Sequence, residues 1–183
     1  ATPHVDENGR KDVVDFVKTI QAKVNAQEGN TLPVSAFNEY VDGSTPSGSS
    51  AYEKRGIAVD IPIWKPENCI QCNRCAYVCP HAVIRPVALT EDELAKAPEG
   101  MEAIDMIGMP GMKFSITVSA YDCTGCGSCA NVCPGKKGEK ALVMENMEAN
   151  AGKQDFFNYG REIPVKPEVV TKFKETTVKG SQF

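Results

Sequence analysis

The sequence has little of what membrane, secreted and nucleic-acid-binding proteins require. No apolar run approaches the ~20 residues that span a bilayer, and the first residues show no signal-peptide pattern. Lys and Arg number 20 against 24 Asp and Glu, a net charge of −4, so no basic excess favours nucleic acid. We therefore expect a cytoplasmic protein that binds neither membranes nor nucleic acid.

Cysteine is absent outside two short runs of one form. Residues 69–80 and residues 123–134 both read C-x-x-C-x-x-C-x-x-x-C-P, and they hold all eight cysteines. A helix that begins near the third cysteine would carry the fourth about 6 Å onward, and in two-cluster ferredoxins that fourth cysteine ligates the other cluster. The sequence therefore predicts one [4Fe–4S] cluster held by Cys69, Cys72, Cys75 and Cys133, and a second held by Cys123, Cys126, Cys129 and Cys79.

Other uses of these cysteines fit the spacing less well. Structural zinc sites pair two C-x-x-C motifs across a spacer, and cysteines three residues apart are poor disulfide partners. The cysteine region is also lean in large aliphatic residues. We expect cluster binding to supply much of its folding free energy, and oxygen-sensitive clusters are typical of the cytoplasm of an anaerobe.

The segments around the two cysteine runs predict the same elements in the same order. Residues 57–64 and 82–87 indicate strands around the first run, and residues 114–118 and 141–144 indicate strands around the second. Pro62 favours an edge position for its strand. The fold class expected is α+β: a bacterial two-[4Fe–4S] ferredoxin-like, pseudo-two-fold domain with an insertion between the halves and N- and C-terminal extensions.

The insertion and the extensions carry weaker signals. Thr90 and Glu93 predict a capping box at the start of a helix in the insertion. An amphipathic helix is expected over residues 11–26 and an extended segment over residues 32–37. Residues 145–183 contain an aromatic group at 156–159, which we expect to be exposed unless something covers it, and residues 169–173 favour a short helix or strand. The apolar stripe of the N-terminal helix comprises Val13, Phe16, Val17, Ile20 and Val24.

Several flanking motifs resemble one enzyme family. Residues 29–37, 42–43, 52–56, 61–64 and 177–183 are similar to segments of the pyruvate:ferredoxin (flavodoxin) oxidoreductases. In that family the Glu-Lys-Arg (EKR) block, here within residues 52–56, names a short domain just before a two-cluster domain. The resemblance divides the chain into an amphipathic helix and linker (1–30), an EKR-type segment (31–56), a two-[4Fe–4S] ferredoxin-type domain (57–150) and a connector (151–183) to a thiamine-diphosphate domain outside this chain.

The resemblance implies an electron relay. In the family, pyruvate and coenzyme A give acetyl-CoA and CO2, and the two electrons leave a thiamine-bound intermediate one at a time. The two clusters here would be the medial and distal relays to external ferredoxin or flavodoxin, working with the remaining domains of a homodimeric parent enzyme. Thiamine diphosphate, Mg and a third cluster are expected only in those other domains.

The chain alone is expected to transfer electrons without turning over pyruvate. It has no metal–diphosphate motif for thiamine, no cysteines for a third cluster and no candidate pyruvate or coenzyme A site, so we predict no catalytic residues in it. One alternative is a free low-potential two-[4Fe–4S] ferredoxin that diffuses between enzymes. There are two further alternatives. One is a module in which the clusters serve mainly to stabilise the structure, and the other is an enzyme that acts on a related 2-oxoacid.

Overall fold

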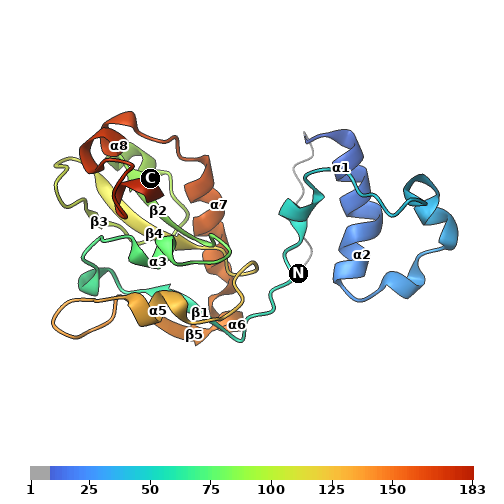
Figure 1. The fold of residues 1–183 in the computed structure, drawn as a ribbon, viewed down its shortest axis with the longest axis horizontal. Coiled ribbons are helices and arrows are strands. Elements are labelled where there is room, and N and C mark those ends of the chain that lie inside the picture. Colours follow the sequence, from blue (N-terminus) through green and yellow to red (C-terminus); the bar gives the residue numbers. More distant parts are fainter. Residues whose placement is uncertain (1–8) are drawn as a thin grey trace. The chain divides into compact units, whose positions relative to one another are not determined.

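The computed structural model describes residues 9–183, so the first eight residues of the predicted N-terminal segment lie outside the described residues. The chain forms two compact units, Ala1–Gly56 and Ile57–Phe183 (Figure 1). Within residues 9–183, no helix is both long enough and apolar enough to cross a bilayer.

The first unit is organised around one helix, as the apolar stripe predicted. Helix α1 (Lys11–Phe16), a π-helical turn (Val17–Gln21) and α2 (Ala22–Asn25) follow one another without a break. Val24, expected in the apolar stripe, is instead 47% exposed. The wider π turn adds a residue to the helical repeat and so rotates the residues after it away from the buried face. The side chains that do form this small core are Val13, Phe16, Val17 and Ile20.

The expectation of an extended segment over residues 32–37 is wrong. Three 3₁₀ segments follow the helix, at Gly29–Thr31, Val34–Tyr40 and Ser49–Tyr52. The Val34 side chain is 89% exposed and therefore does not pack against a core, as an apolar residue of a half-buried strand would. The tight coil instead returns Tyr40 to the helix, where its ring meets Phe16 edge-on with 5.0 Å between ring centroids.

The second unit contains the predicted repeat. Each half runs strand, cysteine loop, short helix, strand. The first half comprises β1 (Asp60–Trp64), α3 (Arg74–Tyr77) and β2 (Ile84–Leu89), and the second comprises β4 (Lys113–Val118), α5 (Ser128–Val132) and β5 (Leu142–Asn146).

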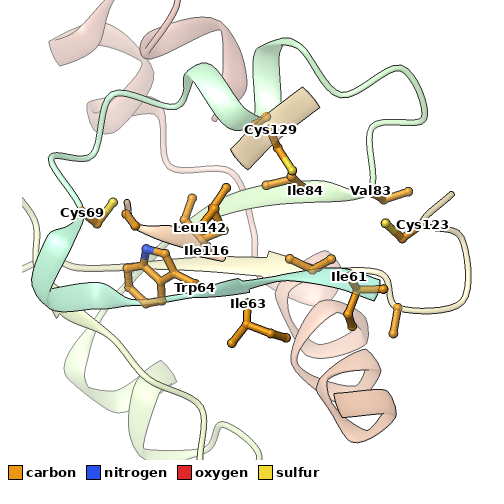
Figure 2. Packing of buried hydrophobic residues seen from close by; sticks show 14 of the residues in the cluster. Ile61, Ile63, Trp64, Cys69, Val83, Ile84, Ile116, Cys123, Cys129 and Leu142 are labelled. Atoms are coloured by element: carbon orange, nitrogen blue, oxygen red, sulfur yellow. The ribbon is translucent and has the colours of Figure 1, made fainter. Parts of the chain in front are cut away.

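Strands of the first half pair with strands of the second half. Strand β1 pairs antiparallel with β5, with Trp64 opposite Leu142, and β2 pairs antiparallel with β4, with Ile84 opposite Val118. Pro62 lies in the two-stranded sheet β1–β5, which confirms its edge position. Buried side chains from both sheets form one core between them (Figure 2), so neither half can fold its core alone.

The insertion extends the second sheet. Strand β3 (Ile104–Asp105) adds to the free edge of β4, giving the order β2-β4-β3. Helix α4 (Glu91–Ala95) begins with the predicted capping box, because the Thr90 hydroxyl accepts a hydrogen bond from the Glu93 N–H and the Glu93 carboxylate accepts one from the Thr90 N–H. Met106, Met109 and Met112 pack against the core and fill the irregular space under this insertion.

The C-terminal extension is part of the second unit and packs on one of its sheets. A short helix α6 (Met147–Asn150) and a 3₁₀ turn (Ala151–Lys153) lead into α7 (Gln154–Glu162), which packs on β4 and β2 and buries Phe157. Residues Pro167–Phe173 form helix α8, and a last 3₁₀ turn spans Gly180–Gln182. The aromatic group expected to be exposed is therefore partly covered by the sheet of its own unit.

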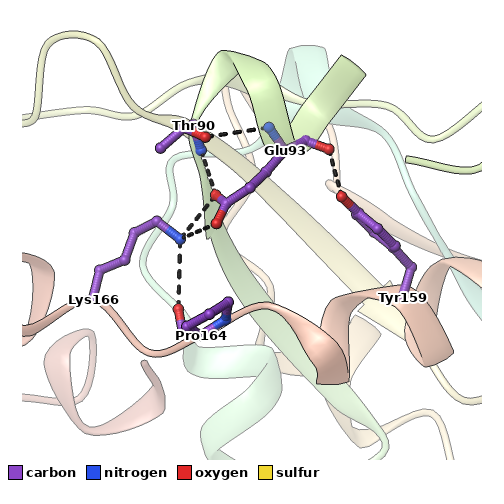
Figure 3. A network of polar contacts seen from close by, with 5 residues as sticks. All are labelled: Thr90, Glu93, Tyr159, Pro164 and Lys166. Carbon is purple, nitrogen blue, oxygen red and sulfur yellow. Dashed lines mark hydrogen bonds and ion pairs between the residues drawn. The ribbon is translucent and has the colours of Figure 1, made fainter. Parts of the chain in front are cut away.

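One polar network ties this extension to the insertion (Figure 3). The Lys166 Nζ lies 2.9 Å and 3.0 Å from the two carboxylate oxygens of Glu93. The Tyr159 hydroxyl donates to the Glu93 carbonyl at 2.5 Å. Burial alone would raise the pKa of Glu93, but the hydrogen bonds from Lys166 and from the Thr90 N–H hold it below its usual value.

Replacing Glu93 with glutamine is expected to lower the free energy of unfolding by about 2 kcal/mol, because a charge-assisted hydrogen bond to a largely buried ammonium is lost. This stabilisation should be complete above pH ~4.3, the ordinary glutamate value, and should vanish as the pH falls through the lowered folded-state pKa. Urea unfolding under anaerobic conditions measures it. The matched control is Glu91→Gln, whose side chain is 69% exposed where it meets Lys113 and should change stability by less than about 0.5 kcal/mol; equal effects of the two variants would contradict the prediction.

Candidate iron–sulfur centres

Two cavities in the second unit gather the cysteines. The first, with about 350 Å³ of empty space including open solvent, is lined by the loop at residues 69–75, by Trp64 and by Leu142. Its four cysteines are Cys69, Cys72, Cys75 and Cys133. Three of them come from the first cysteine run, and the fourth comes from the end of the second run.

The second cavity mirrors the first. It has about 320 Å³ of empty space on the same measure and is lined by the loop at residues 123–129, by Ile84 and by Met144. Its four cysteines are Cys123, Cys126, Cys129 and Cys79. Each cavity thus holds one of the two sets that the sequence predicted.

The four thiols of each site line a cavity and do not converge on a single point. Across residues 9–183, no three His, Cys, Asp or Glu side chains come close enough together to hold a single metal ion. A [4Fe–4S] cluster has irons at four alternate corners of a cube and takes one thiolate per iron, and four cysteines around a shared cavity match that requirement.

Backbone N–H groups point at the sulfurs in the same way in both halves. The Gln71 N–H donates to the Cys69 sulfur at 3.3 Å and the Gly125 N–H donates to the Cys123 sulfur at 3.4 Å. Farther along the chain, the Val83 N–H donates to Cys79 at 3.4 Å and the Ala141 N–H to Cys133 at 3.3 Å. Donors of this kind stabilise thiolate charge and fit an anionic iron–sulfur cluster at each site.

Left-handed backbone turns shape both loops. The second and fourth residues after the first cysteine have positive φ in each run: Gln71 (57°) and Asn73 (59°) in one, Gly125 (72°) and Gly127 (74°) in the other. Glycine adopts this conformation freely, and a Cβ on Gly125 would lie 3.1 Å from the Asp60 carbonyl oxygen. The first loop adopts the same turn with Gln71 and Asn73 in place of glycine. Their side chains are therefore expected to make contacts that offset the conformational cost.

Both side chains make contacts that were not predicted from the sequence. The buried Gln71 amide donates to the Asp105 carbonyl at 2.7 Å and accepts from the Ile107 N–H at 2.8 Å. The Asn73 amide donates to the Lys179 carbonyl at 2.9 Å. These two side chains connect the insertion and the C-terminal segment to the first loop. The sequence signal that could have indicated these contacts is the presence of Gln and Asn in the first run at the positions where the second run has Gly.

Gln71→Gly is expected to loosen the insertion while leaving the loop backbone in place. Glycine tolerates the left-handed turn, but the Asp105 carbonyl and the Ile107 N–H lose their partner, a local loss of about 1–3 kcal/mol. Amide exchange at Ile107 should accelerate roughly 10–100-fold, which hydrogen exchange followed by mass spectrometry measures. Asn73→Gly is the control, because it should loosen residues 177–183 and leave Ile107 protected; unchanged exchange at Ile107 in Gln71→Gly would refute the prediction.

Burial dominates the acidity of the thiols. It raises the pKa of Cys75 to about 12 and that of Cys129 to about 11, and it also raises the pKa of Cys69 and Cys123. Hydrogen bonds from Ser128 instead lower the pKa of the exposed Cys126. Iron binding must therefore displace protons from most of these thiols, and the positive charge of the irons is what makes the thiolates stable there.

Trp64 also lines the first cavity, whereas Arg74, next to Cys75 in the sequence, is not among its lining residues. Trp64, at the end of β1, is 7% exposed, lines the cavity and turns its ring nitrogen toward the side on which Cys69 and Leu142 lie (Figure 2). Arg74, the first residue of α3, is exposed, so solvent screens its charge. Trp64 was not among the residues that the sequence singled out.

A pseudo-two-fold α+β fold with four cysteines around each of two cavities defines a two-cluster [4Fe–4S] protein of the ferredoxin type. Residues 68–137 match the family described as a 4Fe-4S dicluster domain, and residues 3–58 match EKR, a domain of unknown function.

The chain is also similar to parts of several curated proteins. The chain is 46% identical over 168 residues to a pyruvate-flavodoxin oxidoreductase of Enterobacter agglomerans and 49% identical over 172 residues to a pyruvate:ferredoxin oxidoreductase of Moorella thermoacetica, covering 92% of this chain and 14% of each relative. It is 46% identical over 178 residues, 94% of this chain and 9% of the relative, to a pyruvate dehydrogenase [NADP(+)] of Cryptosporidium parvum. The chain is thus similar to one part of the pyruvate–ferredoxin and pyruvate–flavodoxin oxidoreductases and spans about a seventh of the length of these two relatives.

Proposed function

We propose that this chain is the electron-relay part of a pyruvate:ferredoxin oxidoreductase. Its two clusters, the medial and the distal one, would pass single electrons from the oxidative decarboxylation of pyruvate, which forms acetyl-CoA and CO2, to external ferredoxin or flavodoxin. The observation that carries the proposal is the pair of four-cysteine cavities, each completed by a cysteine from the other half of the repeat.

The proposed ligands are the two crossed sets. Cys69, Cys72, Cys75 and Cys133 hold the first cluster, and Cys123, Cys126, Cys129 and Cys79 hold the second. When bound, each cluster supplies a site that gains and loses one electron. The chain holds the irons through its thiolates, limits water through the buried walls of the cavities and stabilises charge through the N–H groups aimed at the sulfurs.

Closeness of the two sites supports passage of an electron between them. Helices α3 and α5, which carry Cys75 and Cys129, pack against each other. Burial is the main cause of the raised pKa of Cys75, and the charges of Cys69 and Cys72 in its own site and of Cys129 in the other add to it. A charge on one cluster would therefore influence the other at short range, as a relay requires.

The other parts of the chain are assigned by the same proposal. Residues 1–30 form a helix and linker, residues 31–56 an EKR-type segment, residues 57–150 the two-cluster domain and residues 151–183 a connector to a thiamine-diphosphate domain. The boundary between the compact units at Gly56 and Ile57 supports this division. The parent enzyme would be a cytoplasmic homodimer, with thiamine diphosphate, Mg and a third cluster in its other domains.

Stopped-flow kinetics test the relay. The protein with both clusters loaded is reduced anaerobically and mixed with oxidised ferredoxin or flavodoxin, and absorbance follows cluster reoxidation. We expect reoxidation that speeds up with acceptor concentration. Clusters that reduce but pass no electron to either acceptor would favour a structural role and overturn the proposal.

The reading frame separates the relay from a free ferredoxin. We expect coding sequence for a thiamine-diphosphate-binding domain to continue directly after the codon for Phe183. A stop codon at that position, together with rapid exchange of electrons with unrelated redox enzymes, would identify the chain as a diffusible carrier instead.

A further inference from the structure

Among the described residues, none serves as a hydrogen-bond partner of the Trp64 indole N–H. Trp64 lies five residues before Cys69, and its ring packs edge-on against Phe114 with 6.1 Å between ring centroids. The Nε1 atom of this ring is buried. A buried N–H is costly to leave unpaired, so an acceptor is expected on the side to which the ring nitrogen points.

That side is the first cluster cavity. Trp64 lines the cavity together with Cys69, and Figure 2 shows its ring nitrogen turned toward the Cys69 side. The Cys69 sulfur is therefore the candidate acceptor on that side of the cavity.

At the position of the repeat that is equivalent to Trp64, the second half has no side-chain donor. The residue five positions before Cys123 is Val118, which is buried and apolar. The cysteines of both cavities receive matching backbone N–H bonds, from Gln71 and Gly125 at the start of each loop. The indole is thus a side-chain donor that distinguishes the first site from the second at equivalent positions of the repeat.

We propose that the Trp64 indole N–H donates a hydrogen bond to the Cys69 sulfur of the loaded first cluster and thereby raises the reduction potential of that cluster. Reduction adds negative charge to the cluster and its thiolates, so a donor to sulfur stabilises the reduced form more than the oxidised form. Trp64 is a positioning residue that tunes the relay, and the proposal depends on the ligand sets of the proposed function.

The test exploits the fact that Trp64 is the one tryptophan of the chain. Expression with benzothienyl-alanine in place of tryptophan keeps a bicyclic ring of similar shape and removes only the N–H. Potentiometric titration followed by EPR should then give one midpoint potential moved to a more negative value and the other unchanged. No shift in either potential, or a shift of both by the same amount, would overturn the proposal.

Trp64→Phe serves as a second variant and should move the same potential in the same direction. Because the smaller ring could disturb the core around Phe114, the unsubstituted protein provides an independent measurement. With [15N]indole-labelled tryptophan, pulsed ENDOR of the reduced protein should detect coupling of one cluster to the nitrogen and to an exchangeable proton. The absence of both couplings would refute the hydrogen bond.

Iron and sulfide analysis distinguishes a failure of the proposed ligand sets from a failure of the role proposed for Trp64. Protein that fails to assemble two clusters even with Trp64 intact would contradict the proposed ligands. Protein that assembles both clusters but shows no change of potential and no nitrogen coupling would contradict the role of Trp64 alone.

Discussion

Replacing Cys72 and Cys133 together with alanine is expected to leave one intact [4Fe–4S] cluster, whereas replacing Cys72 and Cys79 together should leave none. Under crossed ligation the first pair belongs to one site, which keeps only two thiolates and loses its cluster, while the other site keeps all four. The second pair takes one ligand from each site, and neither retains the four thiolates that a cubane needs. Mössbauer spectroscopy with iron analysis after anaerobic reconstitution counts the intact clusters.

Ligation within each run predicts the opposite result, because Cys72 and Cys79 would then share a site. The mirrored pairs provide the control for unequal folding of the variants: Cys126 with Cys79 should leave one cluster and Cys126 with Cys133 none. A protein that kept an intact cluster in the Cys72/Cys79 variant and none in the Cys72/Cys133 variant would disprove the crossed assignment.

Local sequence signals predicted the repeat because its elements depend on neighbours in the chain. The cysteine spacing, the alternating residues of β4 and the Thr90 capping box all act within a few residues, and the structure has them where they were expected. Strand β2 was placed two residues too early. Ala82 has a left-handed φ of 51°, and the next N–H, that of Val83, donates to the Cys79 sulfur, so residue 82 still belongs to the turn after the cysteine run and β2 begins at Ile84.

The features that escaped prediction depend on residues far apart in sequence. Gln71 contacts the insertion more than 30 residues later, and Asn73 contacts Lys179 across 106 residues. The C-terminal extension gave no sign of a core because its partners, β2 and β4, lie in another part of the chain. Trp64 looked like an ordinary strand residue, and its importance emerges only from the cavity that its ring nitrogen faces.

Removing the iron is expected to unfold most of the unit Ile57–Phe183 while leaving the helix of the first unit protected. The sheet β1–β5 has only two strands, and such a sheet is marginal on its own. Without clusters, its core would border two cavities lined by thiols, so the free energy of cluster binding is largely folding free energy. The first unit contains no cysteine and has its own core around Val17 and Ile20.

Trp64 reports this transition directly, because it is the sole tryptophan and is buried beside the first cavity. After anaerobic chelation its emission should strengthen and move to longer wavelength as the quenching cluster leaves and the ring meets water. Hydrogen exchange should rise sharply in β1 and β5 and stay low over residues 13–20, and adding iron and sulfide should reverse the change in the second unit. Retained exchange protection in β1 and β5, with Trp64 emission still at short wavelength, would mean that protein packing alone holds this unit together and that the clusters contribute electron transfer without stability.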